Sequence, residues 1–137
     1  MKNPHDIIVA PYITEKSVAL SYGDDNSALL RKKHELKKAG TAPKKGEKIA
    51  VTEEDLVRKY TFLVAKSSNK IEIKQAIEAI YNAGKKKGET IEVQSVRTVR
   101  VLGKKRRRGQ RSVGYEPDRK KAIITLAKGQ ILEDYGV

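Results

Sequence analysis

Residues that can bind a phosphate backbone are concentrated in one short stretch of the sequence, 103–114. The stretch reads GKKRRRGQRSVG, and its six cations are Lys104, Lys105, Arg106, Arg107, Arg108 and Arg111. Arginine presents a planar fork of donors that pairs with phosphate in a bidentate manner and stacks on bases. The glycines let the backbone bend toward an irregular surface and approach it closely. This composition favours a flexible loop that binds phosphate groups.

Cations continue on both sides of this stretch. From Arg97 to Lys121 the chain has eleven basic and two acidic residues, a net charge of +9 out of the total of +13. Folded RNA suits such a segment, because its deep major groove hides the base edges and recognition falls to shape and backbone. The further candidates for RNA contact are Arg97, Arg100, Arg119, Lys120 and Lys121, together with Tyr115.

Two alternatives stay open for these residues. Tyr115 could stack on an unpaired base, but a lone aromatic residue in a loop often packs on its own chain instead. The basic run as a whole could be a solvated, solubilising loop or a localisation-type patch.

Residues for catalysis or metal binding are sparse. Histidine, the commonest general base near neutral pH, occurs only at His5, beside a proline, and at His34, inside a basic segment. Cysteine is absent, and the acidic group Glu53, Glu54 and Asp55 has the position of first-turn helix charges. The phosphate-cradling pattern GxxxxGK does not occur either. We therefore expect no enzymatic activity, no cofactor and no metal site.

The overall composition agrees with a polyanionic partner. The 137 residues include 30 Lys and Arg against 17 Asp and Glu. Such a balance predicts binding to nucleic acid or to an anionic membrane surface, and the arginine-rich loop favours nucleic acid. The start of the sequence lacks the apolar run of a signal peptide, and no stretch approaches the roughly 18 apolar residues of a membrane span. We expect a soluble, intracellular protein without membrane insertion.

The elements that must position the basic loop are predicted from hydrophobic periodicity. Residues 60–65 and 90–103 predict strands, and 122–126 predicts a strand buried on both faces, which belongs in the middle of a sheet. Residues 69–81 predict a helix that begins at Asn69 and lays one apolar stripe on that sheet. The fold class is α+β: a split β-α-β unit with a small antiparallel sheet of three to four strands, packed with helices and carrying a long basic hairpin loop. A broken alternation in the second strand predicts a β-bulge near Arg97.

The N-terminal third is predicted as short pieces. The apolar patch 7–9 is long enough for a short strand or a packed arm, and 14–23 predicts a short helix that Thr14 caps. We expect a single domain over 1–137, with a basic excursion inserted at about 24–59 and the extended RNA-binding hairpin loop at about 103–118.

The excursion 24–59 has a character of its own. A helix in it would begin at Asn26 or Ser27, and its only apolar stripe would consist of Leu29, Leu30 and Leu36. Because so little apolar surface is available, we expect the excursion to become ordered on a partner. A solvated arm without a binding role is the alternative.

Five motifs in this order resemble the bacterial type of large-ribosomal-subunit protein twenty-three. They are PYITEKS, YTFLVA, NKIEIKQAIEAIY, VRTVRVLGKKRRRGQR and DRKKAIITLAKG. The resemblance implies a structural component of the large subunit, in the cytoplasmic ribosome, that contacts ribosomal RNA and neighbouring ribosomal proteins beside the polypeptide exit tunnel. In that family the hairpin loop threads between RNA helices and can reach the tunnel wall, which corresponds here to Gly103 to Val113.

The resemblance also implies a docking site for nascent-chain factors. The segment that matches it is Ile13, Thr14 and Glu15, and the partners implied are the ribosome-associated folding chaperone and the signal recognition particle. The chain departs from the family where the excursion 24–59 replaces a short link, and where Arg97 and Arg119 replace a typical asparagine and tryptophan. The charge alone also permits an alternative function, that of a free RNA-binding regulator with little sequence preference.

Overall fold

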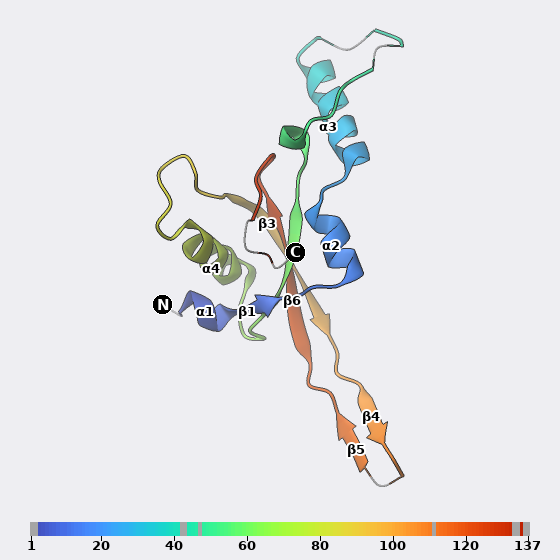
Figure 1. Ribbon diagram of the computed structural model, residues 1–137, viewed down its shortest axis with the longest axis vertical. Helices are drawn as coiled ribbons and strands as arrows, with labels where there is room; N and C mark the ends of the chain where they lie inside the picture. Colours follow the sequence, from blue (N-terminus) through green and yellow to red (C-terminus); the bar gives the residue numbers. More distant parts are fainter. Residues whose placement is uncertain (1–2, 42–43, 47, 111, 133–134, 136–137) are drawn as a thin grey trace.

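The protein is an α+β structure built on a four-stranded antiparallel sheet, with a separate two-stranded ribbon at one end (Figure 1). The computed structural model describes residues 3–41, 44–46, 48–110, 112–132 and 135. The strands of the sheet are β1 (Ile8–Pro11), β2 (Lys59–Val64), β3 (Val93–Val101) and β6 (Arg119–Leu126), in the order β1-β2-β6-β3. The ribbon pairs β4 (Lys105–Arg108) with β5 (Ser112–Tyr115). The helices are α1 (Pro4–Ile7), α2 (Glu15–Ser21), α3 (Asp25–Lys38) and α4 (Lys70–Asn82), with a 3-10 turn at Glu53–Asp55.

The central strand is β6, as the sequence predicts. It runs antiparallel to both neighbours, and its Ala122, Ile124 and Leu126 are fully buried. The residues on its other face are only half-buried, so the expectation of burial on both faces holds for one face alone. The split β-α-β arrangement is confirmed, because β6 lies between β2 and β3.

Helix α4 covers the buried face of the sheet. Asn69 caps it by accepting from the Glu72 amide at 2.8 Å, while the Glu72 carboxylate accepts from the Asn69 amide. Its Ile73 and Ile77 are completely buried against the sheet, beside Phe62. At the other end, the Asn82 amide group exchanges two hydrogen bonds with the backbone of Ile91, which fixes the approach to β3.

The β-bulge in β3 lies at a different place from the one predicted. The register with β6 shifts between Val93 and Ser95, and it is regular at Arg97. With the extra residue at Gln94, Val93 and Val96 both face the core, and Val99 is left 40% exposed on the other face. The prediction near Arg97 was wrong because it treated Val99 as a core residue, and only the surroundings of Val99 decide that.

The N-terminal pieces agree with the sequence in part. One helical turn, α1, precedes the short strand β1, and the turn itself was not predicted. Helix α2 begins as expected, because the Thr14 hydroxyl accepts from the Ser17 amide at 3.2 Å.

The excursion folds into a capped helix backed by the returning chain. Asp24 caps α3 by accepting from the Asn26 and Ser27 amides, so the predicted cap at Asn26 or Ser27 was wrong by two or three residues. At the other end Gly40 has φ 77°, and the Thr41 amide donates to the Leu36 carbonyl, which forms a Schellman motif.

The apolar stripe of α3 differs from the predicted one. Leu30 is 66% exposed, and the side chains turned toward the returning chain are Ala28, Leu29 and Leu36. Figure 1 shows α3 at the opposite end of the molecule from the ribbon.

The basic loop is a twisted β-ribbon rather than an irregular loop. Its strands pair from Lys105 with Tyr115 to Arg108 with Ser112, and a tight turn at Gly109 joins them. Gly103 lies where the ribbon joins the sheet, and a Cβ placed there would come within 1.7 Å of the Glu116 carbonyl oxygen. The Gly103 amide also donates to the Asp118 carboxylate at 2.6 Å. Glycine is therefore required for the two chains to approach this closely.

Candidate nucleic-acid interface

The cations predicted to bind RNA lie on the ribbon and on both faces of the adjoining sheet. On the ribbon, Lys105 pairs with Tyr115 and Arg107 with Val113, so these four side chains share one face. Arg106 lies opposite Gly114 on the other face. All six are exposed, including the apolar pair, with Val113 at 50% and Tyr115 at 76%. The ribbon therefore presents cations alternating with apolar groups, a combination suited to phosphates and unstacked bases.

Two arginines have local partners that hold the ribbon in shape. Arg106 Nε donates to the Glu116 carboxylate at 3.0 Å, an exposed pair of the kind that contributes little to stability. Arg107 Nε and Nη2 donate to the carbonyls of Gly109 and Gln110, at 3.2 and 3.1 Å. These bonds order the turn, and Nη1 of Arg107 and both Nη atoms of Arg106 take no part in them. A hollow of about 370 Å³ is lined by Arg106, Arg107, Ser112, Gly114, Tyr115 and Glu116.

Three of the predicted ribbon residues need separate mention. Lys104 is exposed at the base of the ribbon, where its carbonyl accepts from the Glu116 amide at 2.9 Å. Arg108 belongs to β4 through its backbone pairing with Ser112. Arg111 lies outside the described residues.

The face of the sheet turned away from α4 carries a second group of predicted residues. Arg97, Arg119 and Lys121 occupy this open face, opposite Ile123, Val101 and Val99 in the register. Lys121 Nζ lies 5.6 Å from the centre of the Tyr12 ring, within cation–π distance. Because β3 and β6 are connected to the ribbon by only three residues each, the cations of the open face and those of the ribbon follow one another along the same two stretches of chain.

Two predicted residues point to the other face. Arg100 and Lys120 are partners in the register, on the same side of the sheet as α4 but beyond its end. Lys120 Nζ donates to the Ser68 carbonyl, so its charge supports the loop that leads into α4. Arg100 is exposed and lines a hollow of about 100 Å³ with Lys66, Leu102, Asp118, Arg119 and Lys120.

The predicted docking residues lie together at the start of α2. Figure 1 shows α2 and α4 on opposite sides of the sheet. Ile13 is 46% exposed, and Glu15 is exposed in the first turn of the helix. Thr14 is used locally, because its amide donates to the Ser17 hydroxyl at 2.6 Å and its own hydroxyl caps the helix. The two side chains left to face a partner are therefore Ile13 and Glu15.

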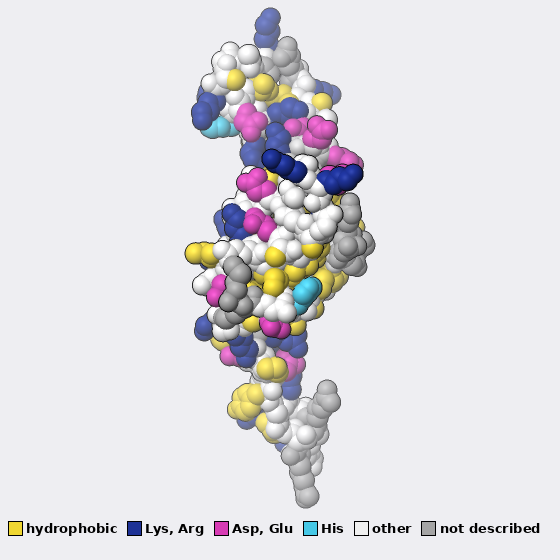
Figure 2. All heavy atoms as spheres, turned by 90° about the vertical axis from the view of Figure 1, so that its left-hand side faces the viewer, with side chains coloured by type: hydrophobic (Ala, Val, Ile, Leu, Met, Phe, Trp, Pro, Cys, Tyr) yellow, Lys and Arg dark blue, Asp and Glu magenta, His cyan; other side chains and the backbone are white. Residues whose placement is uncertain are grey.

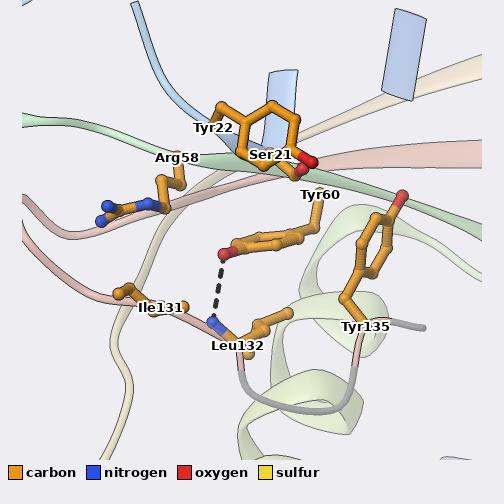
Figure 3. A pocket seen from close by; sticks show the side chains of 7 residues that line it. All are labelled: Ser21, Tyr22, Arg58, Tyr60, Ile131, Leu132 and Tyr135. Atoms are coloured by element: carbon orange, nitrogen blue, oxygen red, sulfur yellow. Dashed lines mark hydrogen bonds between the residues drawn. The ribbon is translucent and has the colours of Figure 1, made fainter. Parts of the chain in front are cut away.

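A pocket of about 250 Å³ opens between α2, the start of β2 and the C-terminal segment (Figure 3). The Tyr60 hydroxyl in it accepts from the Leu132 amide at 3.2 Å, and burial raises the pKa of Tyr60. Arg58 is only 8% exposed, and its Nη1 has no hydrogen-bond partner among the described residues. The lining residues are Ser21, Tyr22, Arg58, Tyr60, Ile131, Leu132 and Tyr135. No sequence pattern signals this pocket, because three segments far apart in the chain build it.

Figure 2 shows the side of the molecule that carries α4, with apolar side chains gathered at mid-height and lysine and arginine side chains above and below them. Among the described residues, no three His, Cys, Asp or Glu side chains lie close enough together to hold a metal ion. The same part of the chain contains no helix with the length and apolar character needed to cross a membrane.

Comparisons with known proteins agree with this architecture. Residues 38–133 match the ribosomal protein L23 family. Proteins named large ribosomal subunit protein uL23 are similar over long stretches. The one from Endomicrobium trichonymphae is 40% identical over 84 residues, which are 61% of this chain and 79% of the relative. The one from Roseiflexus castenholzii is 35% identical over 131 residues, or 96% of this chain and 94% of the relative. The one from Desulforudis audaxviator is 32% identical over 133 residues, or 97% and 95%. The two longer matches extend through the excursion 24–59.

Proposed function

The chain belongs to the ribosomal protein L23 family, and from this membership we propose that it binds ribosomal RNA through the β4–β5 ribbon and the open sheet face, beside the polypeptide exit tunnel. The chain is a structural component of the large ribosomal subunit, in the cytoplasmic ribosome, and its family is not one of enzymes. Its partners there are ribosomal RNA and other ribosomal proteins.

One observation carries the RNA-binding proposal: cations, exposed apart from the half-buried Lys121, continue from the open sheet face onto the ribbon with few carboxylates among them. Arg97, Lys121 and Arg119 lie on the sheet, and Lys105, Arg106 and Arg107 continue the series on the ribbon. Of the described carboxylates in this region, Glu116 pairs with Arg106 and Asp118 accepts from the Gly103 amide. The remaining positive charge is free to replace the counterions of a phosphate backbone.

The shape of the ribbon supports insertion between RNA helices. A strand rises about 3.3 Å per residue, so the six residues from Gly103 to the turn at Gly109 extend on the order of 20 Å beyond the sheet. The exposed Tyr115 and Val113 on one face give such an insertion apolar groups for stacking on unpaired bases. We regard 1–137 as one domain with the ribbon region 103–118 as its RNA-binding extension.

Removal of the ribbon charge tests this proposal. Replacement of Lys104, Lys105, Arg106, Arg107, Arg108 and Arg111 by serine should flatten the slope of log K against log salt for the ribosomal RNA fragment by several units, at about 0.7 to 0.9 per lost contact. The far-ultraviolet circular dichroism of the sheet and helices should stay unchanged. An equal slope for the variant and the wild type would contradict the proposal.

The alternative of a free RNA-binding regulator makes a different prediction for the cell. A ribosomal component cosediments with intact large subunits at close to one copy per subunit and resists a moderate salt wash. A regulator would distribute among RNA-containing fractions in proportion to their RNA. Quantitative detection of the protein across a sucrose gradient separates the two functions.

The family resemblance and the exposure of Ile13 and Glu15 support a second role, the docking of the ribosome-associated chaperone and the signal recognition particle at the start of α2. A basic partner surface would recognise the Glu15 carboxylate by charge complementarity, which sets register and encounter rate. Glu15→Ala should lower chaperone binding to assembled ribosomes several-fold and leave incorporation into the subunit intact. Normal chaperone affinity on those ribosomes would assign Glu15 to the helix dipole alone.

A further inference from the structure

The charges of the excursion are divided between two sides of α3. Successive residues of a helix are turned by about 100°, so Ala28, Leu29, Lys32 and Leu36 form the inward side. These four are the residues of α3 that are buried or half-buried. The opposite, outward side is centred on His34 and carries Lys37 and Lys38, with Lys33 toward its edge; all are exposed.

The inward side is held to the body of the protein by ion pairs. Lys32 Nζ contacts the Asp55 carboxylate at 2.9 Å and donates to the Ala50 carbonyl at 2.8 Å. Lys128, just after β6, lies 3.6 Å from Asp55 and 3.7 Å from Glu35. The Thr52 amide and then Lys32 hold the pKa of the Asp55 carboxyl well below its usual range. The carboxylates nearest the middle of α3 are therefore engaged by Lys32 and Lys128 rather than by the outward lysines.

The outward side keeps its positive charge. Within the described ranges no carboxylate lies at ion-pair distance from Lys33, Lys37 or Lys38. Arg31, which also lies on this side, interacts with the helix cap Asp24. Lys33 and Lys37 are four residues apart and Lys38 follows directly, so three like-charged lysine side chains are crowded over about one and a half turns. Such crowding disfavours an isolated helix, and a polyanion placed against it would relieve the repulsion.

RNA suits this surface better than a protein does. The cores of protein–protein interfaces are depleted of charged residues and enriched in aromatic and apolar ones. Here the only large apolar side chain on the outward side is Leu30, at 66% exposure. Lysines grouped on one side of a helix match the recognition of a nucleic-acid backbone, where contacts go to phosphate oxygens and position the protein without reading sequence.

We propose that the outward side of α3, with Lys33, Lys37 and Lys38, is a second binding site for the phosphate backbone of ribosomal RNA, separate from the ribbon. This inference rests on the proposed function, because it takes ribosomal RNA as the polyanion within reach. Figure 1 places α3 and the ribbon at opposite ends of the molecule, so the two sites would engage different RNA segments. The excursion would thereby fix the orientation of the protein in the subunit as well as its position.

Directed cleavage of the RNA tests where α3 lies. The chain has no cysteine, so a single cysteine can carry a tethered iron chelate that releases hydroxyl radicals. Lys37→Cys reports on α3, Gln110→Cys reports on the tip of the ribbon, and the unsubstituted protein is the blank. In reconstituted large subunits we expect strand breaks from both positions, in two different RNA segments. Breaks from position 110 without breaks from position 37 overturn the α3 site alone, while an absence of breaks from position 110 contradicts the proposed function of the ribbon.

Charge removal tests whether the site binds. The variant Lys33→Gln, Lys37→Gln, Lys38→Gln keeps residues of good helix propensity. Its control, Lys70→Gln, Lys74→Gln, Lys86→Gln, loses the same charge from exposed positions on α4 and in the loop after it. The α3 variant should flatten the salt slope of binding to large-subunit ribosomal RNA by about 2 units, so that the wild type loses about 16-fold more affinity than the variant between 50 and 200 mM salt. Equal slopes for the α3 variant and the control would overturn the proposal and leave α3 as a solvated helix or a protein contact.

Discussion

At the scale of single residues, Gly103 decides how the ribbon is joined to the sheet. The Glu116 carbonyl occupies the space that a Cβ at position 103 would need, and the Gly103 amide is tied to Asp118. A side chain here can be accommodated only if the two backbone segments move apart, because the nearest atom belongs to the backbone. The close approach of the two chains at the base of the ribbon thus depends on the absence of a side chain at position 103.

We therefore predict that Gly103→Ala loosens the ribbon without unfolding the sheet. Amide hydrogen exchange at Lys105 to Arg107 and at Ser112 to Tyr115 should become at least several-fold faster, while exchange in β2 and β6 stays slow. Gly114→Ala is the matched control, since a Cβ at Gly114 meets nothing within 4 Å and its φ is not positive. Unchanged exchange in the Gly103 variant would show that the backbone relaxes around the added methyl group at no cost.

At the scale of elements, α3 is held by charge far more than by apolar contact. Asp24 accepts from the Asn26 amide at the helix cap, and Asp55 in the returning chain accepts from Lys32. The Ser27 hydroxyl and the Asn26 amide lower the pKa of the Asp24 carboxyl, as Thr52 and Lys32 lower the pKa of Asp55. Both carboxyl groups have a lower pKa in the folded state than their ordinary value of 3.8. The ionised groups therefore stabilise folded α3 at pH values above 3.8. That stabilisation is lost as the pH falls through their pKa in the folded state.

Acid should accordingly loosen α3 before it unfolds the sheet. We expect the backbone resonances of α3 to lose helical chemical shifts as the pH falls below 3.8, while those of β2, β6 and α4 stay native. In Asp55→Asn the helical chemical shifts of α3 should already be weaker at neutral pH. They should change less on acidification, because the Asp55 carboxylate that titrates in the wild type is gone. Simultaneous loss of arm and sheet in the wild type would contradict the independence of the arm.

Deletion of the excursion extends this prediction to the whole element. Replacement of 25–52 by a short Gly-Ser link removes partly exposed ion pairs and one small buried side chain, Ala28. Such surface features contribute little to the cooperative core, so the thermal midpoint of the free protein should stay within about 5 °C of the wild type. A larger drop, or a loss of cooperative melting in calorimetry, would show that α3 is part of the core.

At the scale of the whole molecule, the sheet is a rigid link between two basic ends. Figure 1 shows the ribbon and α3 projecting in opposite directions from the sheet and α4. Sites that share no residues and lie far apart contribute additively to binding. The two proposed RNA contacts, on one body, would restrain its rotation in the subunit, which neither contact would achieve alone.

Additivity is therefore the prediction at this scale. The serine variant of the ribbon and the glutamine variant of α3, combined in one chain, should flatten the salt slope of ribosomal RNA binding by the sum of their separate effects. Filter binding of all four proteins across a salt series measures this. If the combined variant flattens the slope no more than the ribbon variant does, α3 makes no RNA contact that is independent of the ribbon.

The sequence by itself determined the elements whose signals are local. Asn69 and Glu72 specify the start of α4, and the apolar run 122–126 specifies a central strand, because capping and burial patterns depend on residues a few positions apart. The clustering of cations in 103–114 and the resemblance to the family likewise needed no structure. The cationic composition of the candidate interface was therefore predictable from the sequence.

Only the tertiary structure decided which side each charge faces. Arg97, Arg119 and Lys121 share the open sheet face while Lys120 turns to Ser68, a division set by the register of β3 on β6 and by the bulge at Gln94. The outward and inward sides of α3 likewise follow from Asp55 and Lys128, which lie 23 and 96 residues beyond Lys32 in the chain. A sequence pattern records spacing along one element, whereas pairing between distant segments is fixed only when those segments pack together.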